Sequence, residues 1–90
     1  MGIAAVKIKL MPSSPSVNLE KMKETVSAMV EKEGGKNCSI TEEPIAFGLK
    51  ALIVFFAWKE EKELEELEEK LRKVEDVNSV QIIDMRRAFG

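Results

Sequence analysis

The sequence contains no histidine and no tyrosine, and its one cysteine, Cys38, has no partner for an internal disulfide. Without histidine, the usual acid–base, Ser–His–Asp and histidine–zinc chemistries are excluded. The chain also lacks the histidine that usually activates a thiol, so we expect Cys38 to pack as a small apolar side chain. The glycines of EGGKN follow a predicted helix instead of preceding one, unlike a phosphate-binding loop. We therefore predict a protein that is not an enzyme and needs no cofactor or metal.

Long apolar runs and a strong net charge are also missing. The longest apolar run, residues 51–58, is too short to span a bilayer, and the N-terminus lacks the pattern of a signal peptide. A net charge of −2 gives no basic field for phosphates. The 90 residues, 44% of them hydrophobic, suit one domain spanning 1–90. With a lone cysteine, these features predict a cytoplasmic protein with no direct nucleic-acid or membrane partner.

Periodicity predicts six elements in the order β-α-β-β-α-β. Val6, Ile8 and Leu10 alternate with polar or small residues, which is typical of a half-buried strand. Asn18 is predicted to cap the first helix, and Gly34 to end it. The predicted strands cover residues 3–11, 36–42, 49–57 and 77–86, and the second helix covers 59–74. Within that helix, three i,i+4 ion pairs are expected: Glu66–Lys70, Glu68–Arg72 and Glu69–Lys73.

This order predicts an α+β, ferredoxin-like sandwich: a four-stranded antiparallel sheet with two helices on one face. In the third strand both alternating sets are apolar, which indicates a central strand. Periodicity does not decide which set faces the helices. A set on the uncovered face would be available to a partner.

Four stretches carry a resemblance to a known family: KLMPSSPSVNLE, EEPIAFGLKAL, the acidic second helix and VEDVNSVQIIDMRR. In this order and spacing, the chain resembles archaeal translation elongation factor 1-beta, the nucleotide exchange factor for elongation factor 1-alpha. The resemblance implies binding to the GDP-bound partner and exchange of GDP for GTP, without a nucleotide site of its own. It also implies that Phe47, followed by Gly48 and Lys50, contacts the partner at one end of the sheet.

The C-terminus departs from the family's eukaryotic members. Those relatives have a lysine one residue before the end, thought to intrude on the partner's magnesium site. This chain has no lysine after Lys73, and Phe89 stands in the corresponding neighbourhood. Arg86 and Arg87 are the cations near this end, and they join the candidate partner-binding residues. Asp84 is expected to be structural.

Three other hypotheses stay open from the sequence. One is a regulatory ferredoxin-like module that binds a small ligand. Another is an RNA-binding sheet in which Phe56 and Trp58 are exposed for stacking. The third is a subunit that pairs through an open face lined by Leu52, Val54 and Phe56. For Phe47 itself, the alternative is that the ring packs onto its own core.

Overall fold

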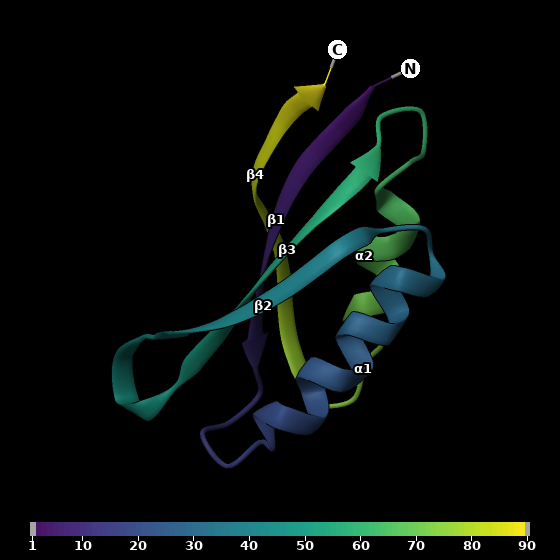
Figure 1. The fold of residues 1–90 in the computed structure, drawn as a ribbon. Coiled ribbons are helices and arrows are strands. Elements are labelled where there is room, and N and C mark those ends of the chain that lie inside the picture. Colours follow the sequence, from purple (N-terminus) through teal and green to yellow (C-terminus); the bar gives the residue numbers. More distant parts are fainter. Residues whose placement is uncertain (1, 90) are drawn as a thin grey trace.

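The computed structural model describes residues 2–89, and it contains the predicted β-α-β-β-α-β order (Figure 1). A short 3₁₀ turn lies between the second and third strands. The elements are β1 (Ile3–Pro12), α1 (Leu19–Lys32), β2 (Lys36–Pro44), the 3₁₀ turn (Ala46–Gly48), β3 (Lys50–Lys59), α2 (Glu65–Arg72) and β4 (Val77–Phe89).

The four strands form one sheet in the order β2-β3-β1-β4, and every neighbouring pair is antiparallel. The prediction that the third strand is central is confirmed, and β1 is the other central strand. Ile8 lies opposite Val54 on one side and Ile82 on the other. Both helices lie on the same side of the sheet (Figure 1). This is the ferredoxin-like α+β fold.

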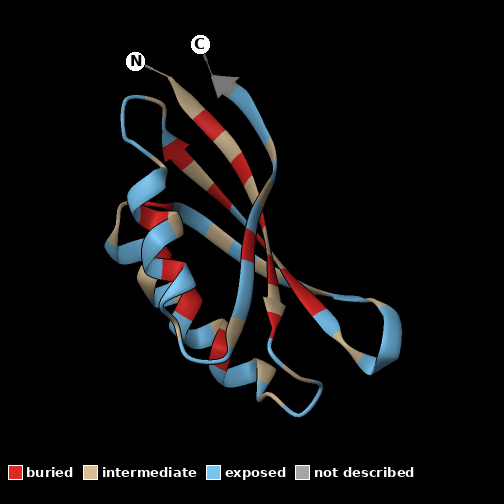
Figure 2. Cartoon of the chain, turned by 180° about the vertical axis from the view of Figure 1, so that it is seen from behind, coloured by how far each residue is buried: buried red, intermediate tan, exposed pale blue. Residues whose placement is uncertain are grey.

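Strict alternation along β1 places every second side chain in the core. Val6, Ile8 and Leu10 are fully buried, as predicted, while the residues between them are partly exposed (Figure 2). The helices supply the other half of the core through Met22, Val26, Val30, Leu67 and Leu71. Each such large apolar side chain stabilises the fold by about 1.5–3 kcal/mol. The core therefore holds both helices against one face of the sheet.

The first helix begins where the sequence predicts. Asn18 has extended backbone angles, and its side chain accepts a hydrogen bond from the Lys21 backbone N–H at 3.2 Å. That bond satisfies one of the N–H groups that the first turn leaves without a partner. At the other end, Gly34 has φ +108°, a conformation that glycine adopts without a steric cost.

The prediction for the second helix is wrong at its start. Strand β3 continues to Lys59, which pairs with Ile3 of β1, and α2 begins only at Glu65. Residues 58 and 59 form a strand instead of a helix because pairing with β1 extends an antiparallel ladder that is already formed. A turn follows, in which the Lys62 N–H donates to the Lys59 carbonyl at 3.0 Å. The Trp58 indole N–H also donates to the Lys62 carbonyl, at 3.2 Å.

The other three strands are also longer than predicted. β1 continues one residue to Pro12, β2 to Pro44 and β4 to Phe89, because these segments keep pairing with a neighbouring strand. Of the three predicted ion pairs in α2, Glu68–Arg72 is present at 3.1 Å. Lys70 lies 2.8 Å from Glu33, the residue that follows α1, instead of pairing with Glu66, so it links α2 to the end of α1.

The structure decides which face of β3 is covered. Leu52, Val54, Phe56 and Trp58 point to the helices and are at most 2% exposed. The hypotheses that used these side chains on the open face, for RNA stacking or for pairing with another chain, are therefore wrong. Phe55 is the β3 aromatic that is exposed on the open face. Lys7 of β1 lies over its ring, with 5.9 Å between the ammonium and the ring centroid.

Candidate functional site

A tight hairpin joins β2 to β3 and extends away from the helices and the chain termini (Figure 1). Its two tip residues, Phe47 and Gly48, both have positive φ, at 61° and 75°. The Leu49 N–H donates to the Ala46 carbonyl at 3.2 Å, and the Ile45 N–H donates to the Leu49 carbonyl at 2.8 Å. The loop beyond the Ile45–Leu49 pair is therefore the three-residue turn Ala46–Gly48, in which Phe47 and Gly48 both take the left-handed conformation, as the central residues of a type I′ turn do.

Phe47 is 93% exposed at this tip, so the alternative that its ring packs onto its own core is wrong. The first position of a type I′ turn favours Asn, Asp or Gly, since other residues pay a steric cost for positive φ. Gly48 suits the second position, and a side chain there would meet nothing within 4 Å. Phe47 therefore combines an unfavourable backbone conformation with a large apolar ring that does not pack in the core.

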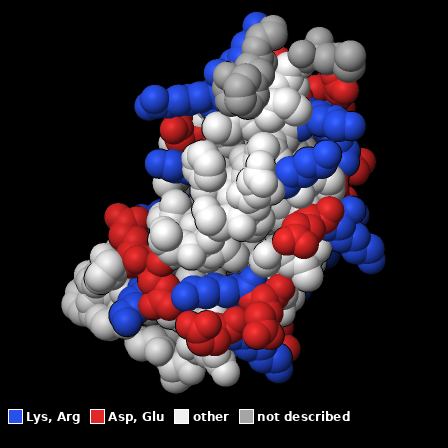
Figure 3. Space-filling view, viewed as in Figure 1, with Lys and Arg blue, Asp and Glu red and all other residues white. Residues whose placement is uncertain are grey.

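The hairpin tip is also uncharged. From Pro44 to Leu49 the sequence has no charged residue, and the tip forms the uncharged projection at the lower left of Figure 3. Charged residues stand directly on either side, at Glu43 and Lys50. An isolated apolar projection of this kind suits a pocket in another molecule better than it suits water.

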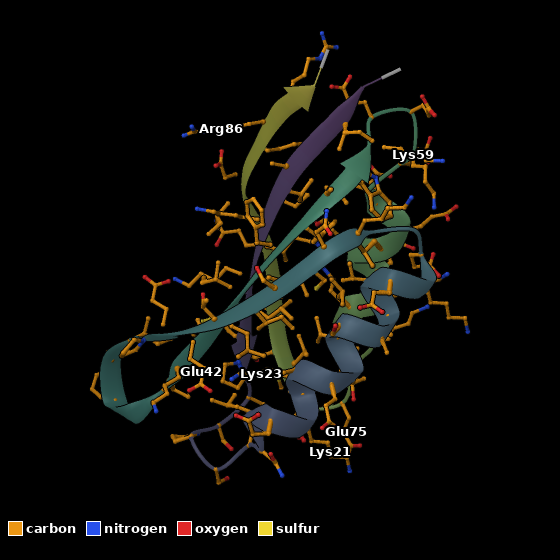
Figure 4. The ribbon with its side chains drawn as sticks, viewed as in Figure 1. Lys21, Lys23, Glu42, Lys59, Glu75 and Arg86 are labelled. Atoms are coloured by element: carbon orange, nitrogen blue, oxygen red, sulfur yellow. The ribbon has the colours of Figure 1, made fainter. Side chains whose placement is uncertain are left out.

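Three charged side chains connect the base of the hairpin to α1. Lys23 of α1 lies 2.7 Å from Glu42 of β2, and Figure 4 shows these two side chains next to each other. Lys50 of β3 lies 3.7 Å from the other carboxylate oxygen of Glu42. The pKa of Glu42 is below its ordinary value, chiefly because of the hydrogen bond from Lys23. Glu42 thus holds the hairpin base against the helix.

The two candidate arginines lie at the opposite end of the sheet, and they differ in their contacts. The Nε and Nη2 atoms of Arg87 donate to the two carboxylate oxygens of Glu60, at 2.7 and 2.9 Å. Arg86 (Figure 4) has an 81% exposed side chain, and among the described residues it forms an ion pair with Asp84, at 3.2 Å. Arg87 therefore ties β4 to the segment after β3, whereas Arg86 is open to solvent.

The structure does not bring the five candidate residues together. Phe47, Gly48 and Lys50 form one group, and Arg86 and Arg87 form another. Ala4 lies opposite both Arg87 and Trp58, so the arginines are level with the far end of β3. Eight residues of β3 separate Lys50 from Trp58, about 26 Å at ~3.3 Å per residue. The side chain of Phe89 lies outside the described part of the chain.

Sequence reasoning missed Glu42 and Glu60, the carboxylates next to Lys50 and Arg87. Nothing local in the sequence indicates these pairs, because Glu60 and Arg87 are 27 residues apart and Glu42 meets Lys50 only across the hairpin. Between residues 2 and 89, no three His, Cys, Asp or Glu side chains come together to hold a metal ion. None of the helices described is long and apolar enough to cross a membrane. Burial raises the pKa of the Cys38 thiol, as expected for an unreactive cysteine.

The geometry defines a ferredoxin-like domain whose most distinctive surface is a projecting aromatic hairpin. Residues 5–88 match the family described as the EF-1 guanine nucleotide exchange domain, and the chain belongs to this family. It is similar to elongation factor 1-beta from Methanosarcina barkeri, with 43% identity over 88 residues, which cover 97% of this chain and 99% of the relative. Elongation factor 1-beta from Methanocaldococcus jannaschii is 36% identical over 89 residues, covering 98% and 100%. The same-named protein of Methanococcus vannielii is 34% identical over 86 residues, covering 94% and 97%.

Proposed function

We propose that this chain, as one exchange domain spanning residues 1–90, binds GDP-loaded elongation factor 1-alpha and promotes exchange of GDP for GTP. The observation that carries the proposal is Phe47: its ring is 93% exposed on a backbone with φ 61°. Strain at an exposed residue persists where the residue has a function outside the fold. The match to the exchange-domain family supplies the partner class.

The mechanism is binding, without a covalent step by this chain. An exchange factor accelerates GDP release if it binds the nucleotide-free GTPase more tightly than the loaded one, because only differential affinity shifts the equilibrium. A short hydrogen-bonded turn suits this task, since an aromatic ring has few rotamers to lose when it enters a pocket. The proposal requires no bound nucleotide, metal or nucleic acid on this chain.

Arg86 and Arg87 support a second contact, at the end of the molecule opposite the hairpin. Arg86 is exposed, and its contact with Asp84 is a weak surface pair. We include Arg86 as a cation that faces the GTPase, and we assign Arg87 chiefly to the link with Glu60. The molecule is 41 Å long and 18–21 Å wide. Two contacts at its ends would therefore bind well-separated parts of the partner.

The test is release of labelled GDP from the cognate elongation factor 1-alpha, with and without this protein. Acceleration that increases with protein concentration, and that depends on Phe47, is the expected result. An unchanged release rate at excess protein would contradict the proposal. In that case, calorimetry with small ligands would test the regulatory-module alternative.

A further inference from the structure

A cleft of about 280 Å³ lies beside the aromatic hairpin. Its walls come from the end of β1, the loop that follows, the first residue of α1 and one side of the hairpin, from Gly48 at its tip to Lys50. The lining residues are Pro12, Ser14, Pro15, Leu19, Gly48 and Lys50. Gly48 follows Phe47 directly, so the cleft borders the residue that carries the exposed ring.

The cleft has mixed polar and apolar walls and one cation. Proline and leucine side chains supply the apolar part, Ser14 and Lys50 the polar part, and the side chain of Lys50 is 54% exposed. The Lys50 ammonium is 3.7 Å from Glu42, which is longer than a normal hydrogen bond. Lys23 approaches the same carboxylate to 2.7 Å. Glu42 is therefore compensated by Lys23, and Lys50 can turn to another acceptor without leaving Glu42 unpaired.

We propose that this cleft receives the carboxylate side chain of an Asp or Glu residue of the GTPase, which pairs with Lys50. The inference rests on the proposed function and adds the chemistry of the second contact. A carboxylate matches the charge of Lys50, and the methylene groups of an acidic side chain match the apolar part of the lining at Pro15 and Leu19. The ring of Phe47 and the cation of Lys50 then act together: apolar burial supplies affinity, and the charge pair fixes the orientation.

Moving Lys50 from Glu42 to the partner costs little. An exposed pair at this distance contributes little to stability, and α1 stays attached to the hairpin through Lys23 and Glu42. The pair formed in the complex is shielded by the cleft walls and by the GTPase, so it is stronger than the pair that it replaces. Glu42 thus stays paired with Lys23 when Lys50 turns to the partner.

The test measures affinity for the nucleotide-free GTPase at low and high salt. Lys50→Ala should weaken binding at least about tenfold, the low end for losing a close charge pair at an interface, and should make binding less sensitive to salt. Lys50→Glu should weaken it further, and Lys50→Arg should retain most of it. Lys32→Glu is the matched control, because Lys32 is exposed in the last turn of α1 and the charge change is the same. It should change affinity less than about twofold.

A second pair of variants tests the cleft itself. Ser14→Phe should fill it and weaken binding while the circular dichroism spectrum stays unchanged. Glu42→Gln should leave affinity near that of the parent protein, since Lys50 keeps its role. Unchanged affinity and salt dependence in both Lys50→Ala and Ser14→Phe would overturn the inference. If Phe47 variants still lost exchange in that case, the proposed function would stand. If the parent protein did not accelerate GDP release, the proposed function would fail first.

Discussion

Replacing Phe47 with asparagine should stabilise the protein and at the same time abolish most of its exchange activity. The native ring is 93% exposed, so its removal costs almost no buried area. Its backbone has φ 61° and ψ 33°, a left-handed conformation that costs an ordinary L-residue about 1–2 kcal/mol. Asparagine tolerates this conformation and is favoured before glycine in a type I′ turn. We expect a gain of about 0.5–1 kcal/mol, which raises the melting temperature by about 2–8 °C.

Thermal unfolding followed by circular dichroism measures the melting temperature, and stimulated GDP release measures the exchange activity. Phe47→Ala is the companion variant: it removes the ring but keeps the strain, so stability should change by less than about 0.5 kcal/mol. Gly48→Ala should lower stability by about 1 kcal/mol through backbone strain alone, because its added methyl group meets nothing within 4 Å. A lower melting temperature for both Phe47 variants, together with normal exchange per folded molecule, would refute the reasoning. The ring would then stabilise the fold and make no contact with the GTPase.

Three further predictions concern the rest of the molecule. Arg86→Ala should slow exchange without changing the melting temperature, whereas Arg87→Ala should lower the melting temperature; equal effects of both on exchange would contradict this division. The pKa of Glu60 is below its ordinary value because of Arg87, so the stability from this pair is present at neutral pH and is lost as the pH falls below about 5. Glu60→Gln should therefore reduce the fall in melting temperature between about pH 7 and pH 3. An unchanged fall would show that other carboxylates cause this pH dependence. Phe56→Ala should cost about 3–5 kcal/mol, because the ring is fully buried, and should lower the melting midpoint by more than about 12 °C.

The parts of the fold that depend on neighbouring residues were predictable. The alternation of Val6, Ile8 and Leu10 predicts the buried face of β1, since side chains of a strand point alternately to its two faces. Asn18 predicts the start of α1, because a cap is made within four residues of chain. The start of α2 was not predictable in this way. Glu and Lys favour a helix from residue 59 onward, but pairing of Lys59 with Ile3 extends β3 instead.

The site was predictable only in part, for a similar reason. The Pro- and Gly-marked corner and the family resemblance indicate Phe47, and the structure shows it exposed. The different contacts of Arg86 and Arg87 could not be deduced, because they depend on where Glu60 lies after folding. The covered face of β3 also could not be deduced, since both of its alternating sets are apolar. Long-range register, which no local pattern contains, decides these features.

The packing of Trp58 makes one end of the molecule visible to fluorescence. It is the chain's single tryptophan, and there is no tyrosine to add to its emission. Its indole lies 4.9 Å from the Lys62 ammonium and edge-on to Phe56, next to the turn that leads to Glu60. Contact with another molecule at this end should change the emission wavelength or intensity of Trp58. Contact at the hairpin, about 26 Å away along β3, should leave the emission unchanged. The fluorescence of Trp58 alone thus distinguishes which end of the molecule is in contact with a partner.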